Sequence, residues 1–210
     1  MSRAERLAPL SAFFVTVFVA AGFIVLGETP SIGDSAEKVA NFYKDNDTEA
    51  FVSSALVSLG AIALVWFGAS LRAHVRRKEG DPGRVASLPF AAAIVIGVGM
   101  TIFAGIEATA ADAADELPAS AIQTINAFDN DMFFTIAAGS LLMFASLSVA
   151  ILRYGAFPKW LGWVTVVMAV ASLTPAGFFA FLLSGILYPV LGLLIYREQT
   201  ERSSPAAGVS

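Results

Sequence analysis

The chain has 210 residues, of which 57% are hydrophobic and 14% charged, with a net charge of −4 and no cysteine. Soluble domains average about 45–50% apolar and about 25% charged residues, so this composition excludes an ordinary soluble domain and favours a membrane protein. The lack of cysteine excludes disulfides, thiolate metal ligands and a cysteine nucleophile, and the small net charge indicates neither an acidic nor a basic partner.

Six apolar runs follow one another along the chain. A helix needs about 20 residues at about 1.5 Å each to cross about 30 Å of hydrocarbon, and every run except the fifth reaches that length. We therefore predict an all-helical bundle of six transmembrane helices in a single domain, 1–202, followed by a disordered tail, 203–210. The predicted spans are 8–27, 51–71, 86–108, 132–152, 160–174 and 176–196.

The first run could instead be a cleaved signal peptide. Its apolar core of about 19 residues exceeds the usual 7–15, and no A-x-A cleavage site follows it. We expect it to be a retained helix.

The last two runs are predicted to form a hairpin. A single helix over 160–196 would be about 55 Å long, too long for an ordinary tilt. Pro175 and Gly177 disfavour its continuation. Basic residues also flank both of its ends, which requires an even number of crossings.

Basic and acidic residues alternate between the segments that connect the runs. All Lys and Arg except Lys38 and Lys44 fall in segments that share one side if the helices cross six times. Because Lys and Arg in short loops set the orientation, we predict a multi-pass cell-membrane protein with both termini cytoplasmic. The basic inner loop 72–78 is expected to attract anionic lipid headgroups by about 1 kcal/mol per charge, not nucleic acid. His74, the single histidine, lies in that loop without the companions of a zinc site.

Two long outer loops each predict a short amphipathic helix on the outer surface. In the first, Asp34 or Ser35 with Glu37 resembles a capping box. Pro118 opens the helix of the second. We favour helices that plug the outer end of the bundle over a binding lid. The predicted buried stripes are Ala36, Val39, Ala40 and Tyr43 in the first loop, and Ile122, Ile125 and Phe128 in the second.

An Asp-Asn-Asp triplet precedes both the second and the fourth run, at 45–47 and 129–131, and both runs end in Leu-Arg. Parallel repeats of this kind occur in transporter folds. Asp and Asn are also preferred helix caps, so we favour capping over a functional acidic pair, and the identity is too thin to establish a duplication.

Glu107, at the outer end of the third run, is the ionisable residue nearest the hydrocarbon. Charges held in lipid are costly and often mark ion pathways, but an interfacial role is the simpler reading of this one. The same run carries Ala93, Gly97, Thr101 and Gly105 at four-residue spacing. Small residues so spaced let another helix approach closely, which predicts a packing seam within the bundle, with a homodimer seam as the alternative.

Pro189 lies inside the sixth run and leaves the Gly185 carbonyl without its usual helical donor. We expect a kink there. With Tyr188 and Ser184 nearby, the kink could line a cavity, although proline is common enough in membrane helices for a structural role.

The order of features resembles a family of small uncharacterised bacterial integral membrane proteins, of the domain-of-unknown-function kind. The resemblance implies six helices in a bacterial inner membrane and carries no activity or site residue with it. The matching segments are Asp34–Tyr43, Leu71–Ala73 and Pro158–Trp163.

We expect a non-enzymatic structural, accessory or sensory membrane protein. The alternative is a small-solute or cation transporter with an acidic outer entrance. Its candidate contacts are Glu107, Asp129 and Asp131 near the mouth and Tyr188 deeper in the bundle. The sequence holds no catalytic triad, zinc, phosphate-loop or dinucleotide motif, so no catalytic residue, cofactor or metal site is predicted.

Overall fold

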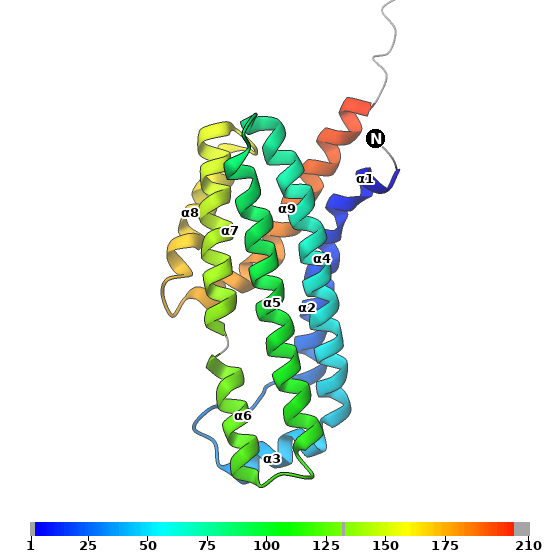
Figure 1. Cartoon of the computed structure of the whole chain (residues 1–210), viewed down its shortest axis with the longest axis vertical. Helices are drawn as coiled ribbons and strands as arrows, with labels where there is room; N and C mark the ends of the chain where they lie inside the picture. Colours follow the sequence, from blue (N-terminus) through cyan, green and yellow to red (C-terminus); the bar gives the residue numbers. More distant parts are fainter. Residues whose placement is uncertain (1–2, 132, 204–210) are drawn as a thin grey trace, which may run out of the picture.

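The structure is a computed structural model that describes residues 3–131 and 133–203, and these residues form helices and connecting loops without any strand. Figure 1 shows the arrangement. The elements are α1 (Arg3–Leu7), η1 (Ala8–Leu10), α2 (Ser11–Leu26), α3 (Ala36–Asp45), α4 (Asp47–Glu79), α5 (Arg84–Ala113), α6 (Ala119–Asp131), α7 (Phe133–Tyr154), α8 (Lys159–Ala171) and α9 (Gly177–Ser203).

Five stretches of the described chain are long and apolar enough to cross a membrane, which makes this a helical protein of the multi-pass membrane kind. The fourth of them covers α6 and α7, whereas α8, with 13 residues, is a shorter apolar helix. The five stretches are Glu5–Leu26, Asp47–Glu79, Arg84–Ala113, Ala119–Tyr154 and Gly177–Arg202.

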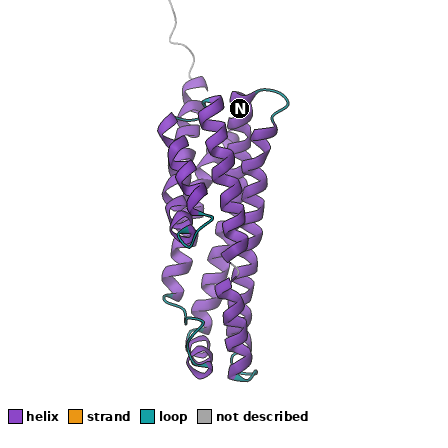
Figure 2. Cartoon of the chain, turned by 90° about the vertical axis from the view of Figure 1, so that its left-hand side faces the viewer, coloured by secondary structure: helices purple, strands orange, loops and turns teal. Residues whose placement is uncertain are grey.

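The helices form an elongated bundle in which α4 and α5 run nearly the full length (Figures 1 and 2). The α4–α5 and α7–α8 connections, α1 and the C-terminal end of α9 lie at one end. At the other end α3 lies across the bundle beside α6. The basic and acidic connecting segments predicted to lie on opposite sides are therefore at opposite ends of the molecule.

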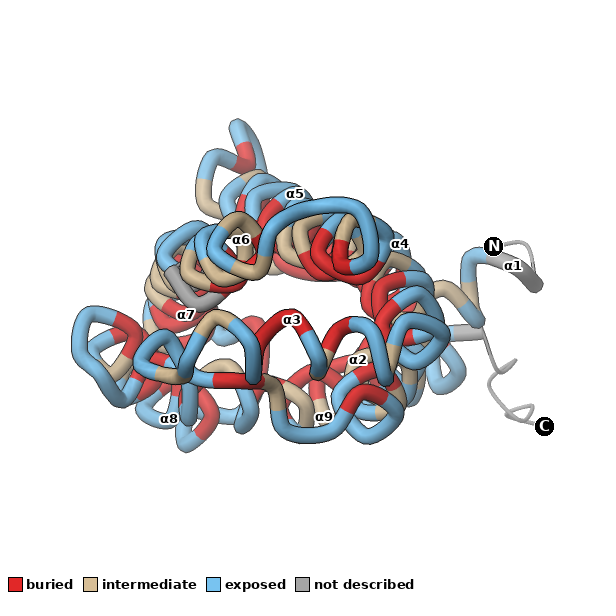
Figure 3. The backbone as a smooth tube through the Cα atoms, turned by 90° about the horizontal axis from the view of Figure 1, so that it is seen from below, coloured by how far each residue is buried: buried red, intermediate tan, exposed pale blue. Residues whose placement is uncertain are grey.

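The outward faces of the long helices are apolar. Seen from the α3 end, buried residues face the interior of the bundle and exposed ones line its outer surface (Figure 3). Many of those exposed residues are large and hydrophobic, such as Trp66 (63% exposed), Val167 and Ile186. A surface of this kind is unfavourable in water and suits contact with lipid.

Two separate cores hold the helices together. The larger one fills the bundle and includes Phe67, Phe144 and Leu147. The smaller one attaches α3 and α6 to the ends of α2, α4 and α5. It consists of Leu26, Val39, Ala40, Tyr43, Ala50, Ala110, Ala111, Ala114 and Ile122.

Only two of the four small residues in the predicted seam of α5 pack closely against another helix of the bundle. A Cβ on Gly68 of α4 would lie 2.6 Å from the Ala93 Cβ, and Gly97 lies against the Ala61 carbonyl, so α4 and α5 approach closely there. Thr101 and Gly105 are exposed, and Gly105 has open space where a Cβ would stand. The predicted packing seam is thus formed by the first two positions and not by the last two.

Pro189 lies inside α9 as expected. The Gly185 carbonyl, which the proline leaves without its helical donor, accepts a hydrogen bond from another helix. The Thr16 hydroxyl of α2 donates to the Gly185 carbonyl at 2.7 Å. Neighbouring helices commonly satisfy backbone groups freed by proline in this way. The proline position is therefore also a point of attachment between α2 and α9.

Three local predictions were wrong. Segment 72–78 is not a loop, because α4 continues to Glu79 and buries His74, which stacks on Phe157 and bonds the Ala156 carbonyl at 2.6 Å. The cap of α3 is Ser35, whose hydroxyl accepts a hydrogen bond from the Lys38 amide, so Glu37 is not at the capping-box position.

On α6 the predicted stripe differs from the buried one, as described below. Of the predicted tail, Ser203 ends α9, and 204–210 lie outside the described residues.

Candidate outer-end cavity and carboxylate cluster

The second amphipathic segment places polar groups inside the molecule. The buried side chains of α6 are Ile122, Asn126 and Asp129, whereas Phe128 is 60% exposed. The face predicted from Ile122, Ile125 and Phe128 is therefore correct for Ile122, which is buried, and for Ile125, which packs against the same core, and wrong for Phe128.

Asn126 joins α6 through its two amide atoms to the rest of the α3 end of the bundle, which we call the outer end after the orientation predicted for it. Its Oδ1 accepts a hydrogen bond from the buried Tyr43 hydroxyl of α3 at 3.1 Å. Its Nδ2 donates to the Pro30 carbonyl at 3.1 Å. One side chain thus ties together α6, α3 and the loop after α2.

Glu107 of α5 is buried, with 2% of its surface exposed. The Ser54 hydroxyl of α4 lies 3.3 Å from its Oε2 and also donates to the Ala104 carbonyl at 2.8 Å. Ser53 supplies a second hydroxyl to the same carboxyl group. Serine hydroxyls, and no basic side chain, are the partners that the structure records for this acid.

Asp129 is the second buried acid, with 4% of its surface exposed. Its Oδ1 has no hydrogen-bond partner within the described part of the chain. Glu107 is near enough to act on it electrostatically. Burial, and then the charges of Asp129 and Glu107, raise the pKa of Tyr43 above its usual value. The two acids and the tyrosine therefore form one cluster, which we call the outer carboxylate cluster.

The two basic residues of the outer end are occupied elsewhere. Lys38 pairs with Asp34 at 2.7 Å, and this pair, together with the Ser31 amide, holds the pKa of Asp34 below its usual value. Lys44 lies 3.3 Å from Asp115 on the surface. Neither is a recorded partner of the outer carboxylate cluster.

Asp129 lines a cavity of about 510 Å³ enclosed by parts of α2, α4, α5, α6, α7 and α9. Among its lining residues Phe23, Gly27, Glu28 and Phe178 are exposed, and we call these four its rim. We call it the outer cavity. Its lining residues are Val19, Phe23, Gly27, Glu28, Thr29, Val57, Met100, Phe103, Asp129, Ile136, Phe178 and Phe181.

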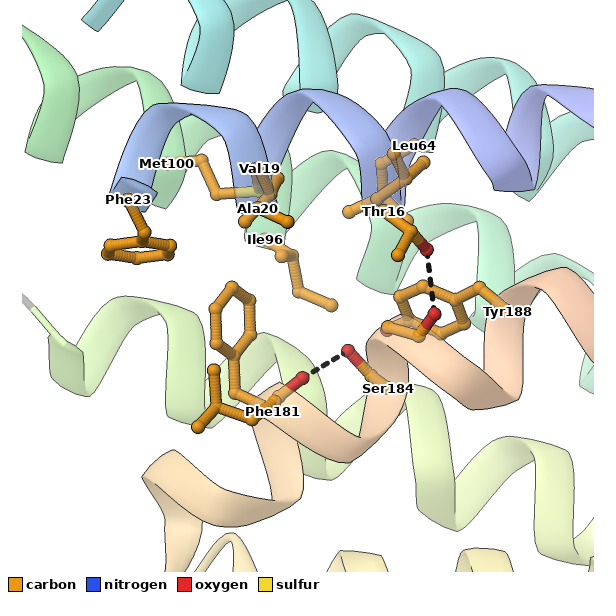
Figure 4. Close-up of a pocket in the computed structure, with 13 residues that line it drawn as sticks. Thr16, Val19, Ala20, Phe23, Leu64, Ile96, Met100, Phe181, Ser184 and Tyr188 are labelled. Atoms are coloured by element: carbon orange, nitrogen blue, oxygen red, sulfur yellow. Dashed lines mark hydrogen bonds between the residues drawn. The ribbon is translucent and has the colours of Figure 1, made fainter. Parts of the chain in front are cut away.

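A smaller cavity of about 110 Å³ adjoins the outer one and lies deeper in the bundle. The two share four lining residues: Val19, Phe23, Met100 and Phe181. Figure 4 shows the deeper cavity, where the Thr16 hydroxyl of α2 donates to the Gly185 carbonyl near Tyr188 on α9, and the Ser184 hydroxyl donates to the Phe181 carbonyl. Their linings together include Asp129 of α6 and Tyr188, which stands beside the Pro189 position of α9.

The predicted site residues lie in different places in the structure. Asp129 lines the outer cavity and Tyr188 the deeper one, while Glu107 lies in the cluster but lines neither cavity. The side chain of Asp131 lies outside the described residues.

The first Asp-Asn-Asp triplet, 45–47, lies at the junction between α3 and α4. The Asn46 side chain donates to the Phe42 carbonyl at the end of α3, and Asp47 is exposed and bonds Thr48. Asp129 of the second triplet is buried instead. The two triplets are therefore not structurally equivalent.

Sequence reasoning missed Asn126, Ser53 and Ser54. The signal for Asn126 was its place four residues after Ile122 and three before Asp129, on one helical stripe. A stripe with two polar members is typical of a solvated face, so the spacing alone does not predict that Asn126 is buried.

Within the described residues no three His, Cys, Asp or Glu side chains gather as a metal site would require. No family model, curated protein or solved structure matches the chain. The resemblance to small bacterial membrane proteins therefore rests on the sequence segments quoted above.

Proposed function

We propose that the chain crosses the membrane six times, with both termini and the basic end on the cytoplasmic side. The fourth apolar stretch, Ala119–Tyr154, at 36 residues or about 54 Å, and α4, at 33 residues or about 50 Å, both exceed the hydrocarbon thickness of about 30 Å. The α8–α9 turn lies near the level of the N-terminal end of α7 (Figure 1). The surplus of α4 and α5 would then project outward and carry α3 and α6 as a cap.

Within that arrangement we propose a non-enzymatic accessory or sensory protein that binds a small, largely apolar solute from the outer side. The observation that carries this proposal is the pair of adjoining cavities from Asp129 to Tyr188. A volume of about 510 Å³ falls within the range of about 300–1,000 Å³ that ligand sites occupy, and an apolar wall with a few polar groups is their usual character.

Filling the cavity should abolish binding. Val19 lines both cavities, so Val19→Phe should remove the stabilisation that a bound solute provides. That stabilisation is about 2.7 kcal/mol at a ligand concentration of 100 times Kd. The measurement is thermal unfolding of the full chain in nanodiscs with a panel of short-chain neutral, anionic and cationic amphiphiles.

Val17→Phe is the matched control, because Val17 lies on the same helix and is exposed on its outer face. We expect at least one compound to raise the unfolding temperature of the wild type and the control, but not of Val19→Phe. A panel without any stabilising compound, or equal shifts in all three proteins, would rule out the binding role.

Transport of the solute is the second candidate, favoured by the extension of the cavity to Tyr188 within α9. A transport role predicts that liposomes containing the wild-type protein take up the stabilising compound. Uptake by the Glu107→Gln variant is measured for comparison. Binding without uptake would leave the sensory or accessory role as the better account.

A further inference from the structure

We infer that the solute is a small organic cation, an ammonium group on an apolar body, held with its charge at Asp129. This inference rests on the proposed binding role and specifies the class of ligand. It is carried by the state of Asp129, by the charges around the cavity and by the aromatic lining.

Asp129 has the features of an anchor for a bound group. Its side chain is 4% exposed, its Oδ1 has no hydrogen-bond partner within the described residues, and it lines the outer cavity. A buried carboxylate without a partner is unfavourable, because the charge loses its hydration without compensation. A cation in the cavity would supply that compensation.

The charges around the cavity favour a cation over an anion. Neither set of lining residues includes a Lys, Arg or His in the described part of the chain. Glu28 adds a second acidic side chain to the lining, and Glu107 is near enough to Asp129 to act on it electrostatically. The ionisable groups of the site are therefore acidic, which suits a cation and disfavours an anion.

The aromatic lining favours an ammonium over other cations. Phe23, Phe103, Phe178 and Phe181 line the same cavity as Asp129. The faces of aromatic rings attract alkylammonium groups, and aromatic residues combined with an acid recognise quaternary ammonium ligands. Phenylalanine rings also accommodate the methyl or methylene groups that surround such a charge.

The remaining lining argues against an inorganic ion. A divalent cation needs about six oxygen ligands, whereas the described residues hold no group of three acidic or metal-binding side chains. The deeper cavity is lined mainly by apolar side chains, including Leu64, Ile96 and Met100. It suits the apolar body of an organic cation better than a hydrated metal ion.

The test is equilibrium dialysis of the full chain in phosphatidylglycerol nanodiscs with two probes. One is hexyltrimethylammonium, and the other is its uncharged isostere, in which carbon replaces nitrogen. We expect the wild type to bind the ammonium at least tenfold more tightly than the isostere. Asp129→Asn should lose that preference and retain binding of the isostere.

Asp115→Asn is the matched control, because Asp115 is an exposed acid at the same end of the molecule. It should keep the wild-type preference. If Asp129→Asn fails to fold, Phe181→Leu takes its place and should weaken ammonium binding severalfold more than isostere binding. Equal binding of both probes to the wild type and to Asp129→Asn would overturn the cation inference and leave the proposed binding role standing. Binding of neither probe would overturn the inference, while the wider amphiphile panel would decide the binding role.

An ammonium group could come from a free amine or from a phosphatidylethanolamine headgroup. Repeating the dialysis with half of the lipid replaced by phosphatidylethanolamine distinguishes the two. Competition with hexyltrimethylammonium would assign the site to the headgroup, and unchanged binding would assign it to a free organic cation.

Discussion

Gly192→Ala is expected to lower the stability of the bundle by about 1–3 kcal/mol, the usual cost of inserting a methyl group into a well-packed interior. A Cβ on Gly192 would lie 2.5 Å from the Pro9 carbonyl oxygen and 2.9 Å from the Ala12 Cβ. The first obstacle is backbone, so it cannot rotate away, and α9 must move off η1 and α2. Thermal unfolding of the purified protein measures the effect.

Gly105→Ala is the matched control, because Gly105 is also a helical glycine but has no atom within 4 Å of the added Cβ. Alanine forms helices more readily than glycine, so stability should stay level or rise slightly. Equal destabilisation by both substitutions would mean that glycine serves the helix backbone itself, and the close approach of α9 to η1 would be contradicted.

Asn126→Leu is expected to destabilise the outer end by about 2–6 kcal/mol. The change keeps the approximate volume but leaves the buried Tyr43 hydroxyl without its acceptor and the Pro30 carbonyl without its donor. Each buried polar group left unpaired costs about 1–3 kcal/mol. Hydrogen exchange of α3 should report the loss directly, since Tyr43 belongs to the core that attaches α3.

Adding Tyr43→Phe to Asn126→Leu should recover part of that loss, because the unpaired hydroxyl is removed together with its former acceptor. Asn41→Leu, at an exposed position of α3, should change stability by no more than about 0.5 kcal/mol. Additive losses in the double variant would contradict a direct link between Tyr43 and Asn126.

Hydropathy located the long helices because a membrane span needs a minimum length of apolar residues. The helix break between α8 and α9 falls where Pro175 and Gly177 predicted it, since neither residue favours a helix interior. The ends were less well predicted. α4 continues beyond Leu71 because charged residues such as Arg76 remain helical once they are in water.

The site was less predictable than the spans. Periodicity assumes that polar residues face solvent, and that assumption fails for Asn126 and Asp129, which are buried on α6. The Pro189 position showed that the Gly185 carbonyl would need a donor. Thr16, which lies 169 positions away, could be identified only from the fold.

The sidedness of the bundle is the central claim, because it places the mouth of the outer cavity outside the membrane. The chain has no cysteine, so single cysteines can be introduced without a background. The decisive position is Thr174, exposed in the α8–α9 turn, with Ser120 as an outer reference and Lys159 as an inner one. An impermeant maleimide applied to intact cells should label Thr174→Cys and Ser120→Cys, and should reach Lys159→Cys only after permeabilisation. Protection of Thr174→Cys together with Lys159→Cys, while Ser120→Cys is labelled, would show that α8 does not cross and would contradict the six-span account.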